Sequence, residues 1–177
     1  VILNFITTPE WYNNKNIHKF MKKTLLIITS IFFILISTNL LSLEKGKWIF
    51  EKDDDWCYIG SLPLNSDLPE TKKRGDNYIL VYKIIGSDDN IVQVEAGYKY
   101  NLDKEIVVKI DNTSFSFYST EDSSETAWTD DDQKVIYAMK KGLELLLSGE
   151  SSRGTITNDT YTLKGFTAAI NKLNKDC

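Results

Sequence analysis

The sequence predicts a mainly β, single-domain β-sandwich with two short α-helices, and three features support this. Short runs rich in Val, Ile, Tyr and Phe alternate with turns rich in Gly, Asp and Asn. Only two segments have helical periodicity, and the second of them closes the chain. The length of 177 residues suits one domain, and no internal repeat, low-complexity tract or linker divides it. Many short strands with few helices favour two packed sheets.

Residues 21–42 have the pattern of a secretory signal peptide. Two lysines near the start precede a twelve-residue apolar stretch and a tail of small polar residues. We expect cleavage after Ser42, and an uncleaved membrane anchor remains open because the uncharged run is long enough to span a bilayer. Residues 1–20 are interpreted as an untranslated or dispensable upstream extension. The folded domain then comprises residues 43–177.

Charge and histidine content exclude several function classes. Residues 43–177 contain 17 Lys and Arg against 24 Asp and Glu, a net charge of −7. Such an acidic domain repels phosphate backbones, so we expect no nucleic-acid partner. The only histidine, His18, precedes the domain, which removes the usual general base, Ser-His-Asp arrangements and most zinc sites. We therefore expect no catalytic residue, no bound metal and no cofactor.

Both cysteines, Cys57 and Cys177, lie in the expected domain. An even number of cysteines in an exported chain predicts one disulfide, although two unpaired buried thiols stay open. This bond would close a loop of more than 100 residues, which stabilises the fold by roughly 4–5 kcal/mol in the chain-entropy model. It would tether the last helix to an early strand, where a free terminus would fray.

The first half of the domain is predicted to form short strands. Apolar runs at 48–50 and 56–59 flank an acidic turn, and a long loop follows at 60–76. Such a loop is long for a compact domain, which suggests mobility or function. Two hairpins are then predicted, at 78–85 with 91–98 and at 106–110 with 115–118.

The second half of the domain contains both helices. Thr129 and Asp132 are placed as a cap for a helix that Gly142 ends, with Val135, Ile136 and Met139 on its buried face. Strands are expected near 143–147 and 155–163. The final helix, about 165–174, carries one apolar stripe, formed by Phe166, Ala169, Ile170 and Leu173.

Three acidic clusters, at 53–55, 88–89 and 130–132, lie in predicted turns or at a predicted helix start. Clustered carboxylates can bind Ca²⁺, but the spacing matches no calcium loop, so solvated turns and helix capping are the favoured interpretation. A close carboxylate pair could also hydrolyse glycosides. The sequence does not supply the distance that such a reaction needs.

Aromatic and basic residues provide the first candidate binding groups. Trp128 could belong to a sugar-stacking surface, although core packing is the favoured role for large aromatic side chains. Lys72, Lys73 and Arg74 form the only basic triplet of the domain and could contact an anionic surface. A solvated loop is the favoured interpretation of this triplet.

Arg153 and Ser151 are the other candidate binding residues. Arg153 is one of only two arginines in residues 43–177 and lies in a turn beside Gly154. Arginine is selected where a planar group with several donors is needed. The favoured interpretation is a structural bridge to a buried carboxylate or to backbone carbonyls. The alternative is recognition of an anion or carboxylate at a loop tip.

Several short motifs resemble a known family of exported proteins. They are Trp56-Cys57, Gly97-Tyr98, the lone Trp128, and, within residues 138–177, Ala-Met-Lys-Lys-Gly, Ser-x-Arg-Gly-Thr, Asp-Thr-Tyr-x-Leu-x-Gly-Phe and the closing Cys. Over about residues 47–177 they resemble the invasion-associated locus B family of alphaproteobacteria. That resemblance implies a periplasmic or envelope-associated β-sandwich with a disulfide. It carries over no catalytic residue.

The leading functional hypothesis is an exported, non-catalytic envelope protein that binds a protein or glycan partner in the periplasm or at the outer membrane. An unremoved signal segment would be its only membrane attachment. The first alternative is a carboxylate-dependent hydrolase of envelope glycans. The second is a surface factor for host-cell contact, as the family name suggests.

Overall fold

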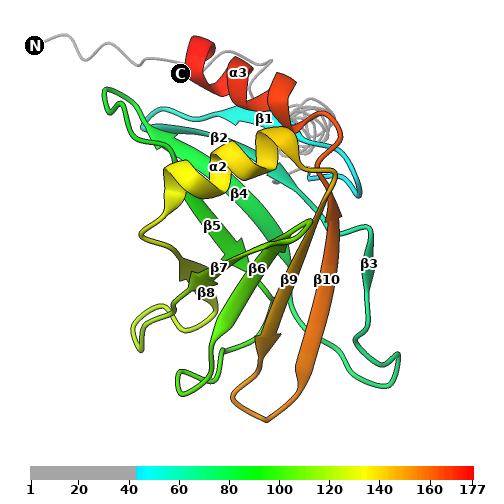
Figure 1. Cartoon of the computed structure of the whole chain (residues 1–177). Helices are drawn as coiled ribbons and strands as arrows, with labels where there is room; N and C mark the ends of the chain where they lie inside the picture. The colour runs from blue at the N-terminus through cyan, green and yellow to red at the C-terminus, as the bar shows by residue number, and fades with distance from the viewer. Residues whose placement is uncertain (1–42) are drawn as a thin grey trace, which may run out of the picture. The chain divides into compact units, whose positions relative to one another are not determined.

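The computed structural model describes residues 43–177 as two five-stranded antiparallel sheets and two helices. The expected mainly β sandwich is confirmed (Figure 1). The first sheet, in spatial order, contains β1 (Ile49–Lys52), β2 (Trp56–Ser61), β4 (Tyr78–Ile84), β5 (Ile91–Glu95) and β8 (Thr126–Trp128). The second contains β3 (Asn65–Ser66), β10 (Ile156–Thr162), β9 (Glu144–Glu150), β6 (Ile106–Ile110) and β7 (Thr113–Phe117).

The core lies between the two sheets because alternate residues of each strand point inward. β9 and β10 show this alternation along their whole length. Leu145 and Leu147 of β9 pack in one apolar cluster with Ile79 and Val81 of β4. These four side chains are at most 1% exposed. The period-2 pattern of the sequence therefore fixes which face of each sheet is buried.

Helix α2 (Asp132–Lys141) buries Val135, Ile136 and Met139, as predicted. The predicted cap was wrong: the N-cap residue is Asp131, and no side chain caps the helix. The Thr129 hydroxyl instead accepts a hydrogen bond from the Asp131 N–H at 3.2 Å. Asp132 accepts one from the Val92 N–H at 2.7 Å. Its carboxylate is therefore used to satisfy a backbone donor of β5.

The position of Asp132 gives a testable pH dependence. Burial raises the pKa of Asp132, and this outweighs the hydrogen bond from Val92, which lowers it. When the pKa of a carboxyl group is higher in the folded state than in the unfolded state, the free energy of unfolding falls as the pH rises from the unfolded-state pKa through the folded-state pKa. Asp132→Asn keeps an oxygen that can accept from Val92 but removes the charge. We expect the melting temperature of the variant, relative to the wild type, to increase with pH across this window.

The control is Asp131→Asn, which alters an exposed carboxylate that pairs with Lys134 at 2.6 Å. Thermal unfolding of the three proteins at pH 4 to 8 provides the comparison. If the melting temperature of Asp132→Asn minus that of the wild type stays constant or decreases as the pH rises, this interpretation is contradicted.

Helix α3 (Phe166–Asp176) closes the chain, and its predicted apolar stripe is confirmed, because Phe166, Ala169, Ile170 and Leu173 are all buried. Gly165 precedes it in the left-handed conformation, with φ of 90°. The predicted disulfide between Cys57 and Cys177 is present, with a Cα–Cα distance of 5.8 Å. It links the end of α3 to β2, next to which α3 lies (Figure 1).

Two short strands were missed by the sequence analysis. β3 has only two polar residues and lies within the predicted long loop, and β8 has three residues. Neither is long enough to show a periodic pattern. β9 was predicted at 143–147 and runs three residues further, while β10 was predicted one residue too long at each end.

The signal peptide and the upstream extension fall on residues 1–42, outside the described residues. Among residues 43–177, neither helix has the length and apolar character needed to cross a bilayer.

Candidate functional site

Five of the six candidate binding residues line one pocket of about 600 Å³. Four segments form it: the segment between β3 and β4, the segment after β5, the end of the segment between β7 and β8, and the turn between β9 and β10. The candidate residues that line it are Lys72, Lys73, Arg74, Ser151 and Arg153. These residues are far apart in the sequence, and the sheet order brings them together.

Arg74 anchors the first loop to the core. Its guanidinium binds both carboxylate oxygens of Asp159, at 2.5 and 2.7 Å, and also donates to the Ala96 carbonyl at 3.1 Å. The Arg74 side chain is 9% exposed and that of Asp159 is 0% exposed. Burial lowers the pKa of Arg74, but the hydrogen bonds and charge of Asp159 raise it more. The pair is a buried, bidentate salt bridge.

The two arginines have roles opposite to those predicted from the sequence. The prediction placed Arg74 in a solvated loop and favoured Arg153 as a bridge to a buried carboxylate or to backbone carbonyls. Arg74 makes that bridge, and Arg153 is exposed, without an ion pair to any residue of 43–177. The reason is topological: Asp159 lies 85 positions from Arg74, and only the folded sheet brings them together.

Ser151 supports the turn that carries Arg153. The Ser151 hydroxyl accepts a hydrogen bond from the Thr155 N–H at 3.1 Å, and its carbonyl accepts one from the Gly154 N–H at 2.8 Å. Gly154 has φ of 76°, which a side chain would disfavour. Ser151 is 6% exposed, so its hydroxyl shapes the turn and Arg153 is the group presented to solvent.

The second loop meets the first through two glycines. The Gly75 N–H donates to the Gly97 carbonyl at 2.8 Å. Gly97 has φ of 72°, and a Cβ there would lie 2.4 Å from the Gly75 oxygen. Both the backbone angle and the close approach therefore require glycine at this position. The contact holds Lys99, two residues later, beside the first loop.

The pocket is basic. Lys72, Lys73, Lys99 and Arg153 are all exposed, and none of them forms an ion pair with any residue from 43 to 177. Lys72 donates a hydrogen bond to the Thr155 hydroxyl at 2.8 Å. Glu125 is the one carboxylate among the lining residues. Four free cationic groups thus converge on a surface of an otherwise acidic domain.

Tyr98 forms part of the pocket wall. The Tyr98 hydroxyl donates to the Gly149 carbonyl at 3.1 Å and lies 2.8 Å from the Thr157 hydroxyl. Burial raises the pKa of Tyr98, so the phenol is neutral at physiological pH. It contributes a fixed polar surface and no charge.

Trp128, the sixth candidate, lies elsewhere. It is half-buried in β8, and its backbone pairs with Gln93 and with Tyr118. The two carboxyl groups with raised pKa values, Glu95 and Asp132, lie outside the lining of the basic pocket. In both cases burial is the main cause. This arrangement gives no support to a carboxylate-dependent hydrolase at the basic pocket.

The described residues contain no cluster of three or more Asp, Glu, Cys or His side chains that could hold a metal ion. Sequence reasoning missed Lys99 and Glu125, because neither belongs to a charge cluster or a recognisable motif. The Gly97-Tyr98 pair just before Lys99 was the nearest available signal.

Comparison with known proteins identifies the family. The model of the invasion associated locus B (IalB) protein family matches residues 51–174, more than half of the chain. The chain belongs to the invasion associated locus B family. The IalB match covers β2 to β10 and most of α3, and therefore includes all four segments that line the pocket.

One solved IalB structure is similar to this chain, the crystal structure of invasion associated protein B from Bartonella henselae. The two chains are 15% identical, with a TM-score of 0.47. The match covers 71% of this chain and 95% of the Bartonella chain. No curated protein sequence matches this member of the IalB family.

Proposed function

We propose that this chain is an exported, non-catalytic protein of the cell envelope that binds an anionic partner through the basic pocket. The observation that carries the proposal is the convergence of Lys72, Lys73, Lys99 and Arg153 without ion-pair partners in the domain. The disulfide supports export, since such bonds persist in oxidising compartments. The partner is a protein or glycan that carries carboxylate or phosphate groups.

The chemistry of the pocket suits this class of partner. Arg153 offers a planar group with several donors, which binds carboxylate or phosphate through paired hydrogen bonds. The lysines add flexible point charges around it. The remainder of the domain is acidic and repels anions, so an anionic partner would be directed to this one surface.

The pocket is also preorganised. The Arg74–Asp159 salt bridge holds the first loop, the Gly75–Gly97 contact holds the second, and Ser151 holds the turn. Because these loops are fixed before binding, less conformational entropy is lost when a partner docks. The buried residues of the site therefore position it, and the exposed cations make the contacts.

Charge reversal tests the proposal in vitro. The probes are fluorescein-labelled pentaglutamate and tripolyphosphate, which present carboxylate and phosphate separately. We expect the Lys73→Glu, Lys99→Glu and Arg153→Glu triple variant to weaken binding at least about tenfold, since each exposed pair contributes up to about 1 kcal/mol. Wild-type binding should also weaken as salt rises.

The matched control changes the same net charge elsewhere, with Lys104, Lys109 and Lys164, all exposed, replaced together by Glu. We expect this triple variant to stay within about threefold of the wild type, because surface charges beyond the Debye length are screened. Equal losses in both triple variants, or none in either, would refute a specific anion site. A preference for one probe identifies the chemical group recognised.

A further inference from the structure

β7 is an edge strand whose outer side is open. It pairs with β6 on one side only. Just beyond it, Tyr118 exchanges two backbone hydrogen bonds with Trp128, at 2.8 and 2.9 Å. Alternate residues of a strand direct their backbone groups to the same side. The N–H and C=O groups of Ser114 and Ser116 therefore face the same outer side, where no strand within residues 43–177 pairs with them.

The other sheet edges of residues 43–177 are protected in familiar ways. β1 ends in Glu51 and Lys52, β3 has two residues, and β8 has three and is bonded to Tyr118. Charge and shortness both discourage pairing with another chain. β7 has five residues, with neither charge nor proline. It is the edge that remains competent to pair.

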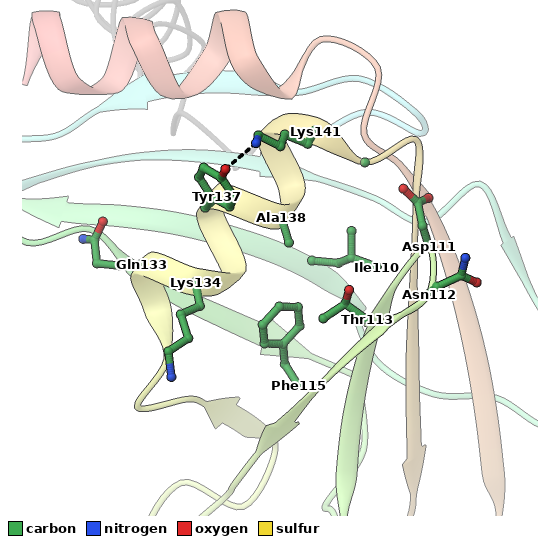
Figure 2. Close-up of a pocket in the computed structure, with 11 residues that line it drawn as sticks. Ile110, Asp111, Asn112, Thr113, Phe115, Gln133, Lys134, Tyr137, Ala138 and Lys141 are labelled. Carbon is green, nitrogen blue, oxygen red and sulfur yellow. Dashed lines mark hydrogen bonds between the residues drawn. The ribbon is translucent and has the colours of Figure 1, made fainter.

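A groove runs between this edge and α2. One part, of about 720 Å³, is lined by Ile110 and Phe115 of the β6–β7 hairpin and by Tyr137 and Ala138 of α2. Figure 2 shows Ile110, Phe115 and Ala138 directed into the space between hairpin and helix. A second part, of about 380 Å³, shares Phe115 and extends along β7 to Asp130. The groove therefore follows β7 along its length.

Charged side chains line both ends of the groove. The Asp111 carboxylate accepts hydrogen bonds from the Leu143 and Glu144 N–H groups. Lys134 pairs with Asp131 at 2.6 Å. Lys141 and Asp130 remain, at opposite ends, as the charged lining groups without an ion pair or a backbone hydrogen bond within residues 43–177.

Lys141 lies at one end, where its ammonium contacts the Tyr137 hydroxyl and sits 4.1 Å from the centre of the Tyr137 ring (Figure 2). Asp130 lies at the other end, beside the Tyr118 hydroxyl at 3.4 Å. Neither Lys141 nor Asp130 forms an ion pair within the described part of the chain. Both charges are available to a partner.

We propose that an extended segment of a partner protein adds to β7 as a further antiparallel strand. Its backbone pairs with Ser114 and Ser116, and an apolar side chain enters the groove between Phe115 and Ala138. Antiparallel pairing places the amino-terminal side of the segment near Asp130 and its carboxyl-terminal side near Lys141. The groove therefore selects a basic residue, then an apolar residue, then an acidic residue. This surface shares no lining residue with the basic pocket.

Substitutions at Ser114 separate the backbone interaction from the side chain. Ser114→Pro removes the outward N–H while the hydrogen bonds of β7 to β6 come from other residues. Ser114→Ala is the matched control, because it keeps that N–H and removes only an exposed hydroxyl. Ala138→Phe fills the groove from the helix and tests the apolar contact independently of the strand.

The probe is a phage-displayed peptide library with the pattern basic-x-apolar-x-acidic, selected on the purified protein. The most enriched peptide is synthesised with a fluorophore and its affinity is measured by polarisation. We expect Ser114→Pro and Ala138→Phe each to weaken binding at least about tenfold. Ser114→Pro loses one or two backbone hydrogen bonds to the peptide, and Ala138→Phe loses the contact with its apolar side chain. Ser114→Ala should stay within about twofold.

Backbone amide exchange supplies a second readout. Bound peptide should slow exchange at Ser114 and Ser116, which would support the proposal even if Ser114→Pro does not fold. Failure to enrich any peptide, or equal affinity for all variants, would overturn it. The proposal would also be overturned if sedimentation showed that the free protein dimerises and that Ser114→Pro abolishes the dimer. The groove would then bind a second copy of this chain.

Discussion

Arg74→Met will destabilise the fold by about 3–5 kcal/mol, because it leaves a buried carboxylate without its partner. Asp159 is 0% exposed, and Arg74 supplies both hydrogen bonds that its carboxylate oxygens receive from side chains in residues 43–177. Arg74 also donates to the Ala96 carbonyl and to the Ser66 hydroxyl, and these acceptors lose a donor as well. Urea unfolding of the wild type and the variant gives the difference.

Two companion proteins make the Arg74 prediction specific. Arg153→Met, at the other arginine, should change the free energy of unfolding by less than about 0.5 kcal/mol, as is usual for an exposed position. The double variant Arg74→Met with Asp159→Leu removes both charges and should be more stable than Arg74→Met alone. If Arg74→Met and Arg153→Met cost the same, the assignment of Arg74 as the structural arginine is wrong.

Removing the disulfide is the second change with a large expected effect. Cys57 and Cys177 are 120 positions apart, and closing a loop of that length restricts the unfolded chain by roughly 4–5 kcal/mol in the chain-entropy model. We expect the Cys57→Ala, Cys177→Ala double variant to lose stability of this order in urea. Helix α3 should still dock in the native state, because Phe166, Ile170 and Leu173 remain buried against the core.

Amide exchange in α3 distinguishes an effect of the disulfide on the unfolded chain from an effect on the docking of α3 in the native state. The native-state protection of Ile170 and Leu173 should persist in the double variant, while the last turn near Asp176 exchanges faster. A loss of less than about 1 kcal/mol would show that the disulfide does little for stability. Complete loss of protection along α3 would show that docking of the helix depends on the bond.

Elements with a strong periodic pattern were predictable from the sequence. The stripe on α3 and the alternation around Phe115 and Phe117 follow directly from the spacing of apolar residues. The disulfide followed from the even number of cysteines in a domain that we expected to be exported. In these cases the relevant interaction is set by local spacing or by residue type, so no knowledge of sheet order was needed.

Features that depend on sheet order were not predictable. Thr129 and Asp132 match a capping pattern, but the backbone of β5 approaches Asp132 and takes its carboxylate. Arg74 and Arg153 have similar polar surroundings in the sequence, and only the position of Asp159 on β10 separates their roles. The groove beside β7 likewise exists because β7 is at the edge of the second sheet.

The residues of the basic pocket were partly predictable from the sequence, but their arrangement was not. The sequence singled out Lys72 and Arg153 by residue type and composition, and both line the pocket. It did not show that the two segments meet, and it gave no reason to expect Lys99 or Glu125 among the lining residues. Candidate residues can be recognised singly, whereas a site requires their arrangement.

Photo-crosslinking in intact cells tests the central claim, binding of an anionic partner at the basic pocket, most directly. A photoreactive amino acid replaces Ser152, an exposed pocket residue that pairs through its backbone with Lys99, and a control carries it at exposed Ile84, which does not line the pocket. We predict one envelope protein or glycan, rich in carboxylate or phosphate, joined at position 152 and lost in the Lys73, Lys99 and Arg153 charge-reversal variant. Equal adducts at both positions, or adducts unaffected by charge reversal, would contradict the account.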